Sequence, residues 1–339
     1  MGIVTAPIQE SLTTRSKAPV FVIGCGRSGT TLLYHMLLSS GNFAIYRTES
    51  NVLNLLEPRF GDLSKARNKR RLLEAWYRSR LYTLSGLDKA GLEARVMAEC
   101  SNGGDFLRIL MEQMCRKQGV ARWADTTPEH LLYLPRIKAT IPGALIVHII
   151  RDGRDVALST AKLGYIRRLP WDRTPETMVA GLYWEWMVGK GREDGHKLGN
   201  DYLEVRFEDL ITNPEKTLSK IGAFIEHELD YERIRKAGIG SVSAPNTSFR
   251  DNGKNDSFKP LGRWRSGYRR EHLSRLECLI GPTLEELGYD LATTGDSVPA
   301  RSRLRILREL YRAYFSGKLF LKAKTPLARM LVTRDLSWI

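Results

Sequence analysis

The residues best suited to chemistry in this chain lie in a glycine-rich turn near the N-terminus. An apolar stretch ends at Ile23, residues 24–29 contain three glycines and Arg27, and a second apolar stretch follows. Glycines let a backbone wrap closely around an anion, and a helix N-terminus directs free N–H groups towards it. The pattern therefore predicts a buried strand, a phosphate-cradling loop and a helix.

The loop differs from that of an ATP-binding protein at one position. Gly24 and Gly29 have the spacing of a Walker A loop, but Thr30 stands where that loop carries its lysine. Arg27 offers a planar fork of five donors instead. We therefore expect an anion related to the triphosphate of ATP, but not ATP itself.

A second chemical motif follows an apolar run at residues 144–150. This run is rich in β-branched residues, which is typical of a parallel strand buried on both faces. Ligands of open α/β sheets bind beyond the carboxyl ends of the strands, where Arg151 comes next. Asp152 or Asp155 would cap the following helix. Ser159, eight residues after Arg151, is expected near the start of that helix, so that both face one phosphate.

These two motifs resemble those of the sulfotransferases that use 3′-phosphoadenosine 5′-phosphosulfate (PAPS). Residues 27–31 look like the family's 5′-phosphosulfate loop, and Arg151 and Ser159 match its 3′-phosphate ligands. The resemblance covers roughly residues 18–290 and implies a three-layer α/β domain with a P-loop-containing nucleoside triphosphate hydrolase-like fold. Its central parallel sheet would have about five strands.

The resemblance also implies a reaction: in-line transfer of a sulfuryl group from PAPS to an acceptor hydroxyl, with no metal. Glu49 matches the general base, and Lys259 matches a donor-contacting lysine in a late basic loop. Arg27 and the N–H groups of residues 28–31 would stabilise charge on the sulfuryl group and the leaving phosphate. The residues of that loop expected to bind the donor are Arg27, Ser28, Gly29, Thr30 and Thr31.

Three positions depart from the family pattern. Asn51 stands where the tyrosylprotein enzymes carry a substrate-contacting arginine, Thr126 replaces a lysine, and Phe207 replaces a tyrosine. Asp125 and His130, next to Thr126, are further candidates for the site. A kinase-like phosphotransferase and a catalytically silent sulfotransferase-like binding protein stay open as alternatives. The acceptor is a glycan, a glycolipid, a small-molecule alcohol or a tyrosine, and we favour a glycan or glycolipid slightly.

Composition bounds the class of protein. The chain has 339 residues and a formal net charge of +15, which would steer a polyanionic donor. Nucleic acid is not the expected partner, because no basic run is interleaved with aromatic residues. The four cysteines show neither paired nor metal-binding spacing. The cysteine spacings and the lack of an apolar run long enough to span a membrane together predict that the protein is located in the cytoplasm.

We expect three regions: a flexible segment at residues 1–17, a sulfotransferase domain at 18–298, and a basic amphipathic segment at 299–339. The last region starts with a run of alternating arginine and apolar residues after Pro299. A helix of this kind either lies on an anionic membrane surface, here the inner one through residues 299–324, or packs on the domain or on a second copy in a homodimer.

Overall fold

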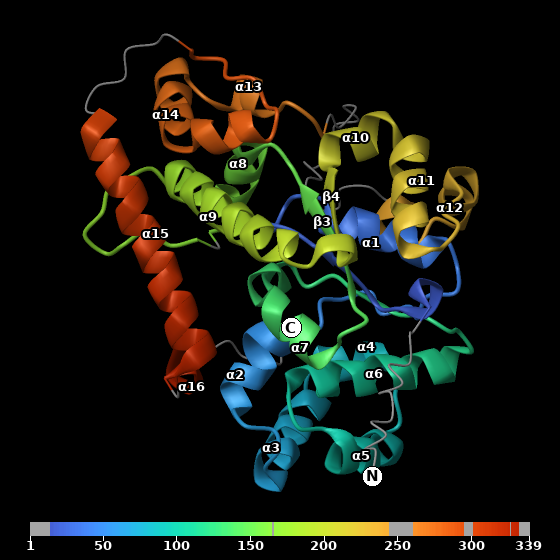
Figure 1. Cartoon of the computed structure of the whole chain (residues 1–339). Helices are drawn as coiled ribbons and strands as arrows, with labels where there is room; N and C mark the ends of the chain where they lie inside the picture. Colours follow the sequence, from blue (N-terminus) through green and yellow to red (C-terminus); the bar gives the residue numbers. More distant parts are fainter. Residues whose placement is uncertain (1–13, 165, 244–259, 295–300, 326, 332–339) are drawn as a thin grey trace, which may run out of the picture.

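The structure, a computed structural model, describes residues 14–164, 166–243, 260–294, 301–325 and 327–331. Its centre is a parallel sheet with the strand order β2-β1-β3-β4 (Figure 1). The strands are β1 (Val20–Ile23), β2 (Ala124–Asp125), β3 (Leu145–Ile150) and β4 (Tyr202–Arg206). The carboxyl ends of all four strands therefore lie at one edge of the sheet.

Helices cover both faces of this sheet, which confirms the expected three-layer α/β fold. Val20 and Val22 of β1 pack into one hydrophobic core, whereas Phe21 and Ile23 pack into the other. Successive side chains of a strand point to opposite faces, so burial on both sides requires a continuous apolar run. β3 satisfies the same requirement, because all six of its residues are buried.

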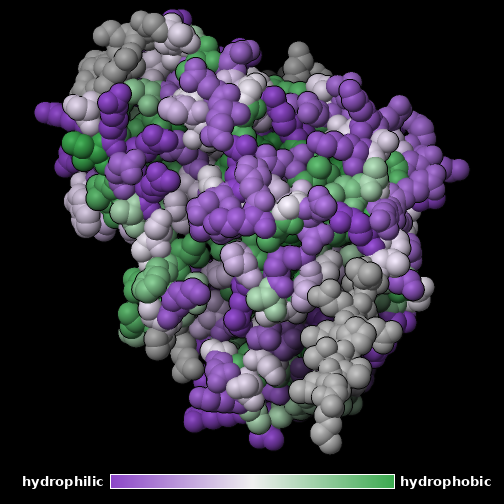
Figure 2. All heavy atoms as spheres, in the orientation of Figure 1, coloured by the Kyte–Doolittle hydropathy of each residue, from purple (hydrophilic) through white to green (hydrophobic). Residues whose placement is uncertain are grey.

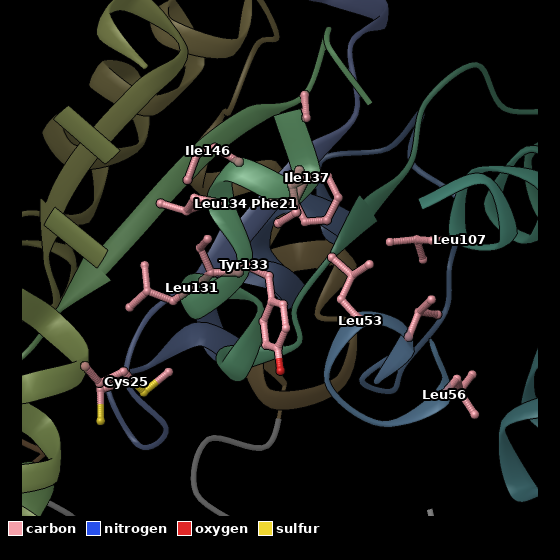
Figure 3. Close-up of a cluster of buried hydrophobic side chains, with 14 of the residues drawn as sticks. Phe21, Cys25, Leu53, Leu56, Leu107, Leu131, Tyr133, Leu134, Ile137 and Ile146 are labelled. Atoms are coloured by element: carbon pink, nitrogen blue, oxygen red, sulfur yellow. The ribbon is translucent and has the colours of Figure 1, made fainter. Parts of the chain in front are cut away.

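The first core lies between the sheet and helices α1, α10, α11 and α12. The second is built largely from the helices between residues 52 and 141 and from α9 (Glu176–His196), α14 (Arg270–Glu286) and α15 (Arg301–Lys324). Figure 3 shows part of the second core, with residues from the glycine loop, β3 and α6. The helices around the first core are α1 (Thr30–Ser39), α10 (Phe207–Thr212), α11 (Pro214–Ile225) and α12 (Tyr231–Ala237).

The remaining helices are α2 (Glu57–Phe60), α3 (Ala66–Tyr77), α4 (Arg80–Ser85), α5 (Lys89–Glu99), α6 (Gly103–Gln118), α7 (Leu134–Thr140), α8 (Gly153–Leu163), α9 (Glu176–His196), α13 (Trp264–Gly267), α14 (Arg270–Glu286), α15 (Arg301–Lys324) and α16 (Ala328–Leu331).

No strand forms after the turn at Gly41, and the described part of the sheet has four strands rather than the expected number of about five. Phe43 makes a single parallel bridge to Arg122. Beyond it, the side-chain amide of Gln118 binds both the N–H and the C=O of Ile45, at 2.7 and 3.1 Å. A side chain thus occupies the backbone groups that a strand neighbour would need.

The basic C-terminal segment packs on the domain. Leu304, Tyr311 and Phe315 of α15 are buried against α9 and α14. Arg308 makes a two-pronged ion pair with Glu185 of α9, at 2.8 and 2.6 Å. In the described part of the chain, no helix combines the length and apolar character needed to cross a membrane.

Candidate active site

The glycine loop has the backbone of an anion-binding turn. Arg27 and Gly29 adopt positive φ angles of 74° and 97°, and Gly29 caps the N-terminus of α1. The N–H of Ser28 donates to the C=O of Cys25 at 3.1 Å. The hydroxyl of Ser28 is buried without a partner among the described residues. Free helix N–H groups beside an uncommitted hydroxyl fit a phosphate-like group.

Phe207 explains why the last position of the loop must be glycine. A Cβ at Gly29 would lie 2.3 Å from the ring of Phe207, which leads from β4 into α10. The same ring lies 4.7 Å from the guanidinium carbon of Arg151. Phe207 therefore supports the loop and the arginine of the second motif at once, a role that the sequence did not reveal.

The structure brings the two predicted donor motifs into direct contact. Nε of Arg27 donates to Oγ of Ser159 at 3.0 Å, and Nη1 of Arg151 donates to the C=O of Arg27 at 3.1 Å. Arg151 and Ser159 are both buried, and Nε of Arg151 has no partner within the described ranges. Arg27, Arg151 and Ser159 thus form one continuous group of contacting residues that carries two positive charges.

The expected place of Ser159 near the start of its helix was wrong. The helix α8 begins at Gly153, and Ser159 lies in its second turn. Asp152 is the capping residue, since its side chain accepts the N–H of Arg154 at 2.9 Å. Ser159 meets Arg27 because of how α8 crosses the loop, not because it is near the cap.

Asp155 does not cap the helix but anchors the chain that follows the late loop. Its carboxylate accepts the N–H groups of Gly262 and Trp264, at 3.0 and 2.8 Å, and also pairs with Arg151 at 3.3 Å. Burial raises the pKa of Asp155, while its contact with Arg151 opposes that rise. Lys259, predicted to contact the donor, lies outside the described residues. The segment directly after it is tied to Arg151 of the second motif.

Arg154 is a structural residue rather than part of a solvated turn. It is buried, pairs with Asp152 and Glu277 at 2.8 and 2.6 Å, and stacks 3.7 Å from the ring of Trp264. These contacts fix the loop between β3 and α8, and hence the position of Arg151.

Glu49 lies half-buried in the irregular segment between the bridge at Phe43 and the helical turn Val52–Leu56. Asn51 orders this segment with a φ of 52°, and its side-chain amide donates to the C=O of Glu49 at 3.3 Å. Asparagine tolerates the left-handed region better than arginine does. The departure from the family at this position therefore has a backbone function.

A buried cluster after β2 clamps the segment that carries Glu49. His130 Nδ1 donates to Asp125 at 2.8 Å, and its Nε2 accepts the N–H of Leu53 at 3.2 Å. Thr127 accepts the N–H of Asn51 at 3.1 Å and contacts Asp125. Because both ring nitrogens are engaged in this way, the imidazole of His130 holds a backbone in place. We infer a positioning function for Asp125 and His130, and the hydroxyl of Thr126 beside them is buried without a described partner.

Acid should weaken this clamp. Burial alone would raise the pKa of Asp125, but its contacts with His130, Ser50 and Thr127 outweigh burial and hold the pKa below its ordinary value. Its stabilising contribution is therefore full above the unfolded-state pKa and is lost as pH falls through the lower folded value. We expect the free energy of unfolding to fall less steeply below about pH 4 in Asp125→Asn than in the wild type. Urea unfolding across pH measures this, and parallel curves would contradict it.

Sequence reasoning missed a second carboxylate in this region. Burial raises the pKa values of Cys25, Tyr133 and Tyr183, and the negative charge of Glu129 adds to the rise in all three. These residues come from the glycine loop, the segment after β2 and α9 (Figure 3 labels Cys25 and Tyr133). The hydroxyl of Tyr133 is buried without a partner in the described part of the chain. Glu129 is thus a second carboxylate near the glycine loop, and its part in proton transfer can be tested against that of Glu49.

The comparisons with known proteins agree with this geometry. A model described as the sulfotransferase family matches residues 19–231, which is more than half of the chain. The chain belongs to the sulfotransferase family. Its resemblance to that family, read first from the two donor motifs, is thereby confirmed, and family and fold together support sulfotransfer as its activity.

One solved structure shares the fold of this chain, and two further solved sulfotransferases are similar to it. The sulfotransferase domain from the curacin biosynthetic pathway is 16% identical with a TM-score of 0.52, over 81% of this chain and 98% of that one. The sulfotransferase domain of the Synechococcus PCC 7002 olefin synthase is 18% identical with a TM-score of 0.49, over 88% and 94%. A Mycobacterium avium sulfotransferase is 14% identical with a TM-score of 0.44, over 80% and 77%. No curated protein sequence matched this chain.

Proposed function

We propose that this protein transfers a sulfuryl group from PAPS to a hydroxyl group of an acceptor. The observation that carries the proposal is the contact between the two motifs. Arg27 of the glycine loop meets Ser159, and Arg151 binds the backbone of Arg27. A donor with a phosphosulfate and a 3′-phosphate needs a cation for each of these groups. Arg27 and Arg151 are two such cations, and they lie next to each other beside the N-terminus of α1.

Each residue then has a distinct function. Arg27 and the N–H groups of residues 28–31 would hold the phosphosulfate and stabilise charge on the leaving phosphate. Arg151 and Ser159, with Lys259 from beyond the described residues, would hold the 3′-phosphate. Glu49 would accept the proton of the acceptor hydroxyl as the bond to sulfur forms. The donor supplies the sulfuryl group.

We favour a glycan or glycolipid hydroxyl over tyrosine as the acceptor. The side chain of Asn51 is engaged with Asn54 and the C=O of Glu49. It therefore does not replace the arginine through which the tyrosylprotein type contacts its substrate. All four cysteines are free thiols and three of them are buried, which supports a reducing cytoplasm as the place of the reaction.

The kinase-like alternative is disfavoured by one observation. Thr30, which carries no charge, stands at the position of the Walker A lysine, so this position presents no cation to a triphosphate. A silent binding protein differs from an enzyme in turnover alone, so donor binding must be measured apart from activity.

Thermal unfolding with nucleotides tests the donor site. Adenosine 3′,5′-bisphosphate at ~100 times its dissociation constant should add roughly 2.7 kcal/mol to the free energy of unfolding. ADP, which lacks the 3′-phosphate, should stabilise the protein far less. Stabilisation only by ATP with Mg²⁺ would overturn the proposal in favour of a kinase. Stabilisation by the bisphosphate without turnover on any hydroxyl acceptor would instead favour a silent binding protein.

A further inference from the structure

The helix α15 has two apolar faces, of which the domain covers only one. Leu304, Tyr311 and Phe315 are buried. On the opposite side, Ile306 and Phe320 are 70% and 60% exposed. Large apolar side chains at such exposure are normal one at a time, but several on one face of a helix mark a contact surface.

The exposed apolar residues repeat at helical spacing. With the exposed small residues Ala313 and Gly317 included, they fall at intervals of three and four residues from Ile306 to Phe320, which places them on one side of the helix. The large side chains of this stripe are Ile306, Leu310, Phe320 and Leu321, with the small residues Ala313 and Gly317 between them. The helix ends near Leu327 and Met330 of the next segment, which are 49% and 74% exposed.

Positive charge flanks this stripe. The sequence of α15 contains eight lysines and arginines and a single acidic residue, Glu309. Arg308 is neutralised by Glu185 of α9. The basic side chains that are exposed are Arg303, Arg305, Arg312, Lys318 and Lys324.

A loop from a distant part of the sequence extends the same kind of surface. The hydroxyl of Tyr311 in α15 donates to Asp172 at 2.5 Å and accepts the N–H of Leu169 at 3.2 Å. Between these two residues, Trp171 is 75% exposed, and it is the most exposed large apolar side chain among the described residues. Arg167, Arg168 and Arg173 of the same loop are also exposed.

The figures show how this surface is arranged. The loop between α8 and α9 reaches α15, which runs along one edge of the molecule (Figure 1). Figure 2, in the same orientation, shows green hydrophobic atoms interspersed with purple hydrophilic atoms along that edge. Exposed apolar groups and basic groups therefore alternate over two adjoining elements.

We propose that α15 and residues 166–173 form a binding surface for an anionic lipid membrane. Apolar side chains with basic flanks are the composition by which helices lie in a membrane interface, and tryptophan favours the same depth. Charge decides against a second copy of the chain as the occupant, because two such faces would bring like charges together, with only Glu309 and Asp172 in each copy to offset them. The inference does not depend on the reaction proposed above.

Sedimentation with lipid vesicles tests this surface on the full-length chain. We expect binding to vesicles of phosphatidylcholine with phosphatidylglycerol, weak binding to phosphatidylcholine alone, and loss of binding as salt concentration rises. The double variant Ile306→Ser with Phe320→Ser should bind about tenfold or more weakly. Trp171→Ser should weaken binding in the same direction.

A matched control tests whether vesicle binding depends on this surface or on any exposed apolar side chain. Leu84 of α4 is 42% exposed and lies outside both elements, so Leu84→Ser should bind as the wild type does. The substituted side chains are exposed, and melting temperatures should confirm that each variant folds. Equal binding to both kinds of vesicle, or no binding to either, would overturn the proposal. Self-association abolished by the α15 substitutions, without vesicle binding, would replace it with a dimer interface.

Discussion

Glu49→Gln is expected to lower turnover by ~100- to 10,000-fold, because the amide cannot accept the proton of the acceptor hydroxyl. Binding of adenosine 3′,5′-bisphosphate should be unchanged, since the phosphate ligands are in the loop and after β3. Steady-state kinetics with PAPS, alongside calorimetric titration of the bisphosphate, separates the two effects. The substitution keeps the size of the side chain, and the clamp on this segment acts through backbone groups of its neighbours.

Glu129→Gln is the matched control for that experiment. The charge of Glu129 raises the pKa values of Cys25, Tyr133 and Tyr183, so it is a second carboxylate near the glycine loop. If Glu49 is the base, Glu129→Gln should retain most of the activity. A large loss in Glu129→Gln with near-normal turnover in Glu49→Gln would transfer the assignment to Glu129.

Arg151→Gln is expected to weaken binding of adenosine 3′,5′-bisphosphate by roughly 10- to 150-fold, the range for one lost hydrogen bond to a charged group. Its guanidinium lies on Phe207, binds the backbone of Arg27 and carries a buried Nε without a described partner. Binding of ADP should change much less, because ADP has no 3′-phosphate. Titration of both nucleotides with both proteins measures the loss of discrimination.

Arg151→Lys tests whether the loss of bisphosphate affinity in Arg151→Gln has a purely structural cause. Arg151 also pairs with Asp155 and binds the C=O of Pro260, so its removal affects the chain that follows the late loop. Lysine keeps the charge and loses the planar fork, and it should restore part of the bisphosphate affinity. Equal losses of bisphosphate and ADP affinity in both variants would show that Arg151 shapes the pocket and does not select the donor.

The sequence predicted the local parts of this site correctly. A strand, a glycine loop and a helix N-terminus follow one another along residues 20–39, as expected. The all-buried β3 before Arg151 was expected on the same grounds. Such features depend on backbone conformation and on burial of neighbouring residues, which short stretches of sequence determine.

The fifth strand and the position of Ser159 were the two errors in describing these elements. Both depended on partners far along the chain. Gln118 binds the backbone of Ile45 in place of a strand, and α8 brings its second turn to Arg27. Neither contact leaves a periodic signal in the sequence.

The sequence by itself therefore determined the class of fold, the two donor motifs and the family to which they belong. Only the tertiary structure decided that Arg27 touches Ser159, that Phe207 supports Gly29, and that Asp125 and His130 hold the segment of Glu49. The physical reason is strand order. The sheet places β1 between β2 and β3, although residues 24–123 separate β1 from β2 along the chain, and the residues of the site lie where the ends of these strands meet.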